Sequence, residues 1–249
     1  MSLNLHAYPS TATAVEALAA RVTQDLLDSV ADSGAALLLV SGGRSPLPLL
    51  TALSQLALPW SCISVSLVDE RCVPRSHADS NTALVAQHLL VNQAAAAHWV
   101  PLVDDALARS GIDDWQLAGA AARRASENPA LEHAAVVILG IGNDGHTASL
   151  FADAPQWSEA RQTTARYVAV QPAHAAHARV GLSLQALRTR SCCYVWASGA
   201  DKRVTINRIA GLVATTQAGR RCETDLVAAG QLALLIADHE VVLDVYHSN

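Results

Sequence analysis

Short apolar runs that end abruptly in glycine or charged residues are the strongest constraint on the fold of this chain. Three of them, Ala35–Val40, Ile63–Val68 and Ala135–Leu139, are each five or six residues long. A strand that is buried on both faces of a sheet has this composition, whereas a half-exposed strand alternates apolar and polar residues. We therefore interpret the three runs as strands of a sheet that is covered on both sides.

Segments with helical periodicity separate these runs. In residues 11–33 apolar side chains recur at steps of three and four, and Gly34 supplies a stop. Further helices are expected at Leu47–Leu56, Asn81–Leu90, Asp113–Ser126, directly after His146, at 200–213 and at 224–234, and further strands at Tyr167–Val170, Val180–Leu184, Tyr194–Ala197 and Val241–Val245. The alternation predicts an α/β fold with a mainly parallel sheet and helices on both faces. Because no linker rich in Pro, Gly or Ser divides the chain, we expect residues 1–249 to form one domain.

Composition excludes several classes of function. The formal net charge is −5, and no run of basic residues suggests a nucleic-acid surface. The five cysteines show no C-x-x-C spacing, so neither a disulfide framework nor a zinc site is indicated. No secretory signal or membrane-spanning segment is recognisable. We expect a cytoplasmic protein that binds a small anionic ligand in a local pocket, with neither a nucleic-acid nor a membrane partner.

Polar clusters follow all three strands, at residues 41–45, 69–71 and 140–146. In open parallel sheets the ligand crevice lies beyond the carboxyl ends of the strands. Their common position predicts one composite active site built from three distant parts of the chain.

The first cluster resembles an anion-binding turn. Gly42 and Gly43 allow the backbone to approach a ligand closely, and the helix that follows directs its N–H groups at an anion. The cluster is neither a Walker A loop nor a G-x-G-x-x-G fingerprint, and an ordinary strand-to-helix turn stays possible. The candidate phosphate-binding residues are Ser41, Gly42, Gly43, Arg44 and Ser45.

The second cluster, Asp69-Glu70-Arg71, places two carboxylates beside an arginine. Ion pairs with these carboxylates would fix the guanidinium of Arg71 and direct it at a substrate oxygen. The alternative is a solvated strand end with surface ion pairs of little energetic value.

The third cluster contains the best candidate for a catalytic base. Glycines at 140, 142 and 145 clear space around a sharp turn, and Asp144 stands two residues before His146. This acid can hydrogen-bond the imidazole of His146, which is a base near neutral pH. Thr147 and Ser149 are expected at the start of the next helix, where hydroxyl groups cap or bind a ligand.

Two other kinds of site are weakly supported. His174-x-x-His177 has a spacing that suits zinc, but no third ligand is obvious nearby, so no metal site is expected. No G-x-S-x-G sequence indicates a serine hydrolase.

Taken together and in order, the clusters resemble the 6-phosphogluconolactonase family. The resemblance covers Ser41–Pro46, then Asp69–Pro74 with Asp79-Ser80-Asn81, then Gly140–Phe151, Arg179-Val180 and Gly199–Lys202. It implies a Rossmann-like α/β fold and hydrolysis of 6-phospho-D-glucono-1,5-lactone to 6-phosphogluconate in the pentose phosphate pathway, without metal or cofactor. The implied substrate is thus a small phosphosugar lactone.

Within this resemblance His146 activates water and Asp144 orients its ring. Gly142 is a candidate substrate-binding residue, and Arg71, Arg179 and Lys202 are candidates for binding the phosphate and the developing negative charge. The sequence does not divide these tasks among them, and it leaves the choice between monomer and homodimer open.

Two rival functions on the same fold stay open. An amino-sugar-phosphate isomerase/deaminase would have an acid where this chain has Phe151, which cannot transfer a proton. A non-catalytic sugar-phosphate sensor could dispense with Asp144 and His146.

Overall fold

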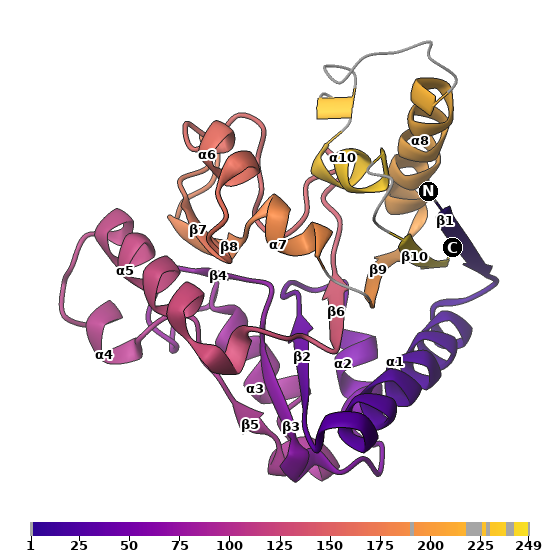
Figure 1. Ribbon diagram of the computed structural model, residues 1–249, viewed down its shortest axis with the longest axis horizontal. Helices are drawn as coiled ribbons and strands as arrows, with labels where there is room; N and C mark the ends of the chain where they lie inside the picture. The colour runs from indigo at the N-terminus through magenta and orange to yellow at the C-terminus, as the bar shows by residue number, and fades with distance from the viewer. Residues whose placement is uncertain (1, 190–191, 218–225, 228–229, 238–241, 249) are drawn as a thin grey trace.

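A parallel sheet runs through the centre of the molecule (Figure 1). The structure is a computed structural model and describes residues 2–189, 192–217, 226–227, 230–237 and 242–248. In these residues the sheet has seven strands, in the order β1 (Ser2–Tyr8), β10 (Val242–Ser248), β9 (Cys193–Ser198), β6 (Val136–Leu139), β2 (Ala36–Val40), β3 (Ile63–Leu67) and β5 (His98–Trp99). All neighbouring strands are parallel. Every residue of β2 and of β6 is buried, as the apolar runs predict.

Helices surround this sheet and confirm the predicted α/β class. They are α1 (Thr11–Ser33), α2 (Leu47–Ser54), α3 (Asn81–His88), α4 (Asp105–Ala108), α5 (Asp114–Glu127), α6 (Trp157–Gln162), α7 (Leu184–Arg188), α8 (Ala200–Gln217) and α10 (Gln231–Ala237), with 3₁₀ turns at Trp60–Cys62, Asn92–Ala96 and Pro129–Leu131. The predicted limits of α1 are correct because the sequence supplies both caps. The Ser10 hydroxyl accepts the amide of Thr13, and Gly34 ends the helix at φ +79°. No helix of the described residues is both long and apolar enough to cross a membrane.

A second, three-stranded antiparallel sheet consists of β4 (Asp69–Arg71), β8 (Arg179–Leu182) and β7 (Tyr167–Val170). The charged triplet that was expected as the end of a strand is therefore a strand itself. Its register places Arg71 directly opposite Arg179. This sheet also supports the loop after β6, since a Cβ on Gly181 would lie 2.3 Å from the carbonyl oxygen of Ala148.

The helix predicted directly after His146 is wrong. Residues 147–150 form a turn closed by an isolated bridge between Thr147 and Leu150. Ala148 and Ser149 have φ of +54° and +55°, which no right-handed helix contains. Thr147 and Ser149 therefore lie in a strained loop rather than at a helix N-terminus.

Two more differences concern the ends of the chain. The sequence reading missed β1, which forms an edge of the sheet by pairing with β10. Of the helix expected over 224–234, residues 226–227 and the start of α10 are helical, whereas 224, 225, 228 and 229 lie outside the described residues. Residue 241, the predicted start of the last strand, also lies outside them.

Candidate active site

The three predicted polar clusters meet in one cavity of about 450 Å³ beyond the carboxyl ends of β2, β3 and β6. We call this cavity the strand-end pocket. Ten predicted site residues line it: Ser41, Gly42, Gly43, Arg44, Ser45, Arg71, Gly142, His146, Arg179 and Lys202. Asp144 is not part of the lining but is hydrogen-bonded to His146.

The loop after β6 forms a tight turn around a histidine. The amide of Gly142 donates to the carbonyl of His146 at 2.8 Å, and the amide of Gly145 donates to the carbonyl of Gly142 at 3.0 Å. Gly145 adopts φ +89°, a conformation that L side chains rarely tolerate. The turn thus brings residues 142 and 146 together across the loop.

Helix α8 holds this turn from the other side. Lys202, in the first turn of α8, donates to the carbonyl of Ile141, and the Thr205 hydroxyl donates to the carbonyl of Asn143 at 3.0 Å. Burial lowers the pKa of Lys202, while the carboxylates of Asp144 and Asp201 oppose that shift. Lys202 is therefore a cation placed at the same wall of the pocket as the histidine.

Asp144 and His146 form a close acid–histidine pair. Asp144 Oδ1 lies 2.6 Å from His146 Nδ1 and also accepts the His146 amide at 3.2 Å. The hydrogen bond to His146 is the main reason that the pKa of Asp144 falls to about 2, despite partial burial. An ionised Asp144 accepts a hydrogen bond from the Nδ1–H of His146, which leaves the lone pair of the imidazole on Nε2.

Gly142 is required for this pair. A Cβ at position 142 would lie 2.2 Å from His146 Nδ1 and 2.3 Å from Asp144 Oδ1. The ring of His146 packs against Phe151 on its other side, with centroids 4.2 Å apart. Both contacts fix the plane of the imidazole.

The loop after β2 joins the first and third clusters. The Ser41 hydroxyl accepts the amide of Gly140 at 3.0 Å, and Gly43 has φ +90°. A Cβ on Gly42 would lie 1.9 Å from Asn81 Oδ1, so only glycine fits there. The amides of residues 42–44 donate to no acceptor within the described part of the chain. Such free amides before a helix can bind an anion.

Arg71 and Arg179 stand side by side on paired strands. Arg71 Nη1 donates to the carbonyl of Asp79 at 2.6 Å, and Arg179 Nη1 donates to the Ser149 hydroxyl at 3.3 Å. The Nε atoms of both arginines are buried without a hydrogen-bond partner. Burial lowers the pKa of Arg179 most, with Arg71 acting in the same direction and Asp69 against it.

The ion pairs predicted within 69–71 are wrong. Glu70 is buried and accepts the amides of Arg71, Asn81 and Thr82 at 2.7–2.8 Å, so it caps α3 instead of pairing with the guanidinium. Burial raises the pKa of Glu70, and these hydrogen bonds oppose the shift. Asp69 accepts the Ser149 hydroxyl. The carbonyl of residue 79, rather than a carboxylate, positions Arg71.

Several lining residues were not among the predicted binding residues. They are Pro46, Asp69, Asn81, Gly140, Ile141, Asn143 and Ala148. Thr147 and Ser149, which the sequence offered as hydroxyls that cap a helix or bind a ligand, also line the pocket. Asn81 could have been proposed, because it follows the helix cap Ser80 and its amide donates to the carbonyl of Asp69 at 2.9 Å. The sequence named Ser149 as a candidate hydroxyl, but it did not indicate the positive φ that places this residue in a loop instead of a helix.

The charge of the strand-end pocket is positive. Its basic lining side chains are Arg44, Arg71, Arg179 and Lys202, and among the described residues Asp69 is the carboxylate in the lining. The buried hydroxyl of Ser45 has no hydrogen-bond partner, as with the two arginine Nε atoms. Unpartnered donors beside excess positive charge suit an anionic ligand.

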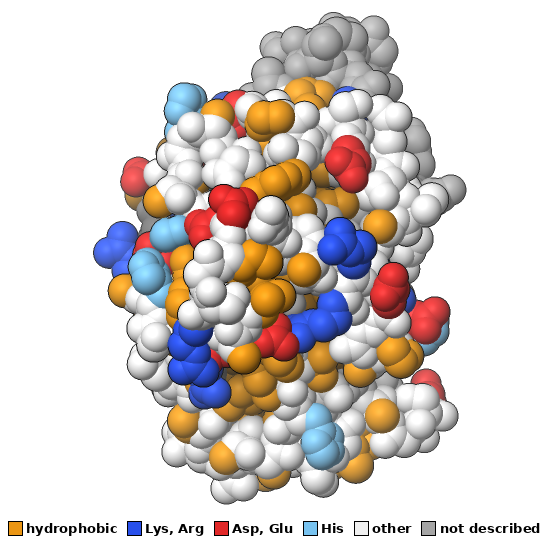
Figure 2. All heavy atoms as spheres, turned by 90° about the vertical axis from the view of Figure 1, so that its left-hand side faces the viewer, with side chains coloured by type: hydrophobic (Ala, Val, Ile, Leu, Met, Phe, Trp, Pro, Cys, Tyr) orange, Lys and Arg blue, Asp and Glu red, His pale blue; other side chains and the backbone are white. Residues whose placement is uncertain are grey.

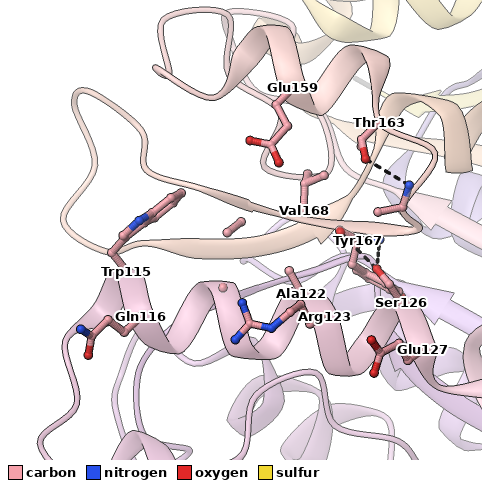
Figure 3. Close-up of a pocket in the computed structure, with 13 residues that line it drawn as sticks. Trp115, Gln116, Ala122, Arg123, Ser126, Glu127, Glu159, Thr163, Tyr167 and Val168 are labelled. Carbon is pink, nitrogen blue, oxygen red and sulfur yellow. Dashed lines mark hydrogen bonds between the residues drawn. The ribbon is translucent and has the colours of Figure 1, made fainter.

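A larger hollow of about 630 Å³ lies elsewhere, between α5 and β7 (Figure 3). We call it the α5 groove. Trp115 and Arg123 reach it from α5 and Glu159 from α6, and it contains no predicted site residue. Figure 2 shows the side of the molecule that lies at the left of Figure 1, with acidic and basic side chains mixed over its surface.

Comparisons with known proteins agree with the geometry. The sequence profile of the family described as glucosamine-6-phosphate isomerases/6-phosphogluconolactonase matches residues 9–230. A 6-phosphogluconolactonase of Mesorhizobium japonicum is 40% identical over 83% of this chain and 84% of its own, and one of Neisseria meningitidis serogroup A is 37% identical over 82% and 87%.

The fold agrees with a solved structure over its whole length. The crystal structure of a putative 6-phosphogluconolactonase from Neisseria gonorrhoeae superposes with a TM-score of 0.85 at 32% identity, covering 100% of both chains. These findings confirm the resemblance that the sequence motifs indicate. The chain belongs to the family of glucosamine-6-phosphate isomerases and 6-phosphogluconolactonases.

Proposed function

We propose that the strand-end pocket hydrolyses 6-phospho-D-glucono-1,5-lactone to 6-phospho-D-gluconate. Relatives that are 37% and 40% identical to this chain are named 6-phosphogluconolactonase. The observation that supports this reaction most is the Asp144–His146 pair, 2.6 Å apart, at the wall of a positively charged pocket. Lactone hydrolysis needs a base for water and positive charge for a phosphate and an oxyanion.

His146 is the proposed general base. Its Nε2 takes a proton from water while the water oxygen bonds to the lactone carbonyl carbon, giving a tetrahedral oxyanion. When the oxyanion collapses, the bond from that carbon to the ring oxygen breaks. The imidazolium of His146 then returns its proton to the ring oxygen, which becomes a hydroxyl group. Water is consumed, and histidine ends in its starting state.

Asp144 is the proposed partner of this base. Because its pKa is lowered to about 2, it is ionised near neutral pH. It therefore selects the tautomer with a proton on Nδ1 and stabilises the imidazolium that forms during the reaction.

The arginine pair is proposed to bind the phosphate. Two like charges directly opposite on an antiparallel ladder repel each other, and a dianion between them removes that cost. The unpartnered Nε atoms of Arg71 and Arg179 add to this argument.

Lys202 is proposed to stabilise the oxyanion. It lies at the wall that contains the histidine, where it donates to the carbonyl of Ile141 and interacts with Asp144. A cation beside the general base is well placed for charge that develops on the attacked carbonyl.

A lactone assay with an uncatalysed blank tests the function. Fresh lactone is generated in situ, and its disappearance is followed with and without the purified chain, because such lactones also open spontaneously. We expect a rate above the blank that is proportional to protein concentration. A rate equal to the blank contradicts the proposal.

A second arm of the assay tests the deaminase alternative. Phe151 packs against His146 and lies 5.3 Å below the Arg179 guanidinium, where it can offer no proton. We expect no ammonia from glucosamine 6-phosphate. Ammonia release without lactone hydrolysis would replace the proposed function by that of a deaminase.

A further inference from the structure

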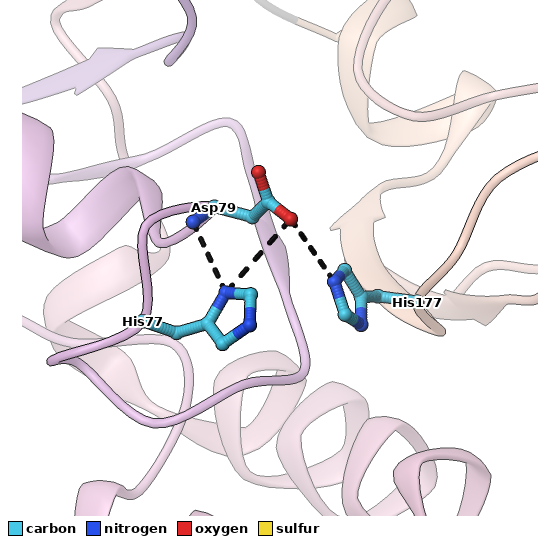
Figure 4. A group of neighbouring side chains, drawn as sticks. All are labelled: His77, Asp79 and His177. Carbon is cyan, nitrogen blue, oxygen red and sulfur yellow. Dashed lines mark hydrogen bonds and ion pairs between the residues drawn. The ribbon is translucent and has the colours of Figure 1, made fainter.

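Three side chains of types that can bind a metal ion lie close together (Figure 4). The proposed reaction does not use them, and the backbone of one, Asp79, contacts Arg71. His77 and Asp79 lie in the loop between β4 and α3, and His177 lies just before β8. His177 is about a hundred residues from the other two in the sequence. The sequence therefore indicated only His174 as a second metal ligand beside it. We call the three residues the His–Asp–His cluster.

The cluster is compact enough for one ion. Its candidate ligand atoms all lie within 4.8 Å of one another. Asp79 Oδ2 is 3.1 Å from His177 Nε2 and 3.8 Å from His77 Nδ1. Ligand atoms around a tetrahedral zinc ion are about 3.3 Å apart, given bonds of about 2.0–2.1 Å. His77 and Asp79 are exposed, so small rotations of their side chains close the remaining gap.

The Nδ1 atom of His77 faces the Asp79 carboxylate. The amide of Asp79 donates to His77 Nδ1 at 3.1 Å, so this nitrogen acts as an acceptor, and it lies 3.8 Å from the Asp79 carboxylate. A metal ion bound to this nitrogen would replace a single hydrogen bond, the one donated by the backbone amide of Asp79.

A fourth side chain supports His177. Asp114 Oδ2 lies 3.7 Å from His177 Nδ1, on the nitrogen opposite to the one that faces Asp79. Histidines that bind a metal through one ring nitrogen usually donate the other N–H to a carboxylate, which fixes the ring and its tautomer.

We propose that the His–Asp–His cluster is a binding site for a divalent transition-metal ion, with zinc the best match. Two imidazoles and one carboxylate suit zinc rather than magnesium or calcium, which prefer oxygen ligands alone. The fourth position is open to water. The ion would join the loop after β4 to the segment before β8, so it braces the two strands that present Arg71 and Arg179.

Zinc titration of the purified, chelator-treated chain tests the proposal. Competition with a chromogenic chelator should give one zinc ion per chain. Loss of a residue that only hydrogen-bonds a metal ligand lowers metal affinity by about 10–100-fold. Asp114→Asn should therefore weaken zinc binding by about tenfold. Asp79→Asn and His177→Ala remove proposed ligands, so each should weaken zinc binding by more than about 100-fold. Circular dichroism and thermal unfolding establish that each variant is folded. Equal zinc affinity in wild type and His177→Ala would overturn the site.

Two matched variants separate this site from its neighbours. His174→Ala changes an exposed histidine three residues from His177, and we expect unchanged affinity. If it weakens binding as much as His177→Ala does, the ligands are the His-x-x-His pair and the proposal is wrong. His146→Ala should also leave one zinc ion bound, and loss of zinc there would place the ion in the strand-end pocket instead. No substrate is needed, so the result is independent of the lactonase activity.

Discussion

The α5 groove and the strand-end pocket differ in chemistry more than in size. The α5 groove is larger, at about 630 Å³ against about 450 Å³ for the strand-end pocket. In the groove the hydroxyls of Ser126 and Thr163 are bonded to neighbouring backbone groups. In the strand-end pocket, Ser45, Arg71 and Arg179 each have a buried polar atom without a partner. Unsatisfied donors and a fixed acid–histidine pair mark a functional site better than volume does.

The difference follows from topology. The strand-end pocket lies where parallel strands end and where loops from three distant parts of the chain meet, so several polar groups converge on it. The α5 groove lies between one helix and the outer strand of the small antiparallel sheet, away from the carboxyl ends of the parallel strands. Substitutions in the two hollows should therefore have opposite consequences for activity and stability.

Among the substitutions that compare the two hollows, removal of one arginine of the strand-end pocket should lower kcat/KM the most, and it tests phosphate binding. Arg179→Ala should lower kcat/KM by about 10²–10³, since it removes one of two paired cations. Steady-state kinetics, together with inhibition by inorganic phosphate, measures this. Arg123→Ala in the α5 groove is the matched control and should leave both quantities unchanged. An equal loss in the two variants would remove the distinction between the hollows.

A methyl group at Gly142 should act through the acid–histidine pair. The new Cβ would lie 2.2 Å from His146 Nδ1, so Asp144 and His146 must separate. A misplacement of about 1 Å in a catalytic group can cost about 10² in rate, so we expect kcat to fall by that order. Kinetics of the folded Gly142→Ala variant checks this, and wild-type kcat would contradict the tight fit.

The pH profile should show a single acid limb. The pKa of Asp144 is lowered to about 2 by its hydrogen bond to His146, so its carboxylate is lost only as pH falls toward that value. Above about pH 4 the acid limb of the logarithm of kcat/KM should therefore have a slope of one, because Asp144 stays ionised and adds no second protonation. A slope of two in that range would show that Asp144 titrates with the histidine.

The smallest effect is expected at Gly119 in the α5 groove. A Cβ there meets only Arg123 Nη1, at 3.8 Å, and the position is inside a helix. Gly119→Ala should raise the free energy of unfolding by about 0.5–1 kcal/mol and leave kcat unchanged. Urea unfolding and the lactone assay measure the two quantities. Reduced activity would connect the groove to the reaction.

The sequence predicted β2, β3 and β6 because strands that are largely buried on both faces stand out as apolar runs. It did not predict β5, which has two residues. It missed β1, since an edge strand such as Ser2–Tyr8 has polar residues and depends on β10, more than 230 residues away. It also mistook Asp69–Arg71 for a strand end, because pairing with β8 is set by tertiary contacts.

Within the site, the spacing of Asp144 and His146 was enough to predict their pairing. The helix expected after His146 was wrong because Ala148 and Ser149 adopt positive φ, which their residue types do not indicate. The role of Glu70 as a cap for α3 was likewise hidden, since its partners are backbone amides eleven and twelve residues away.

The most direct measurement compares wild type with His146→Ala in the lactone assay at saturating substrate, with the uncatalysed rate subtracted. His133→Ala, an exposed histidine, is the control, and thermal unfolding establishes that both variants are folded. Loss of the general base should lower kcat by about 10²–10⁴, while His133→Ala keeps the wild-type rate. A folded His146→Ala variant with a kcat close to that of wild type would contradict the proposed chemistry of the strand-end pocket.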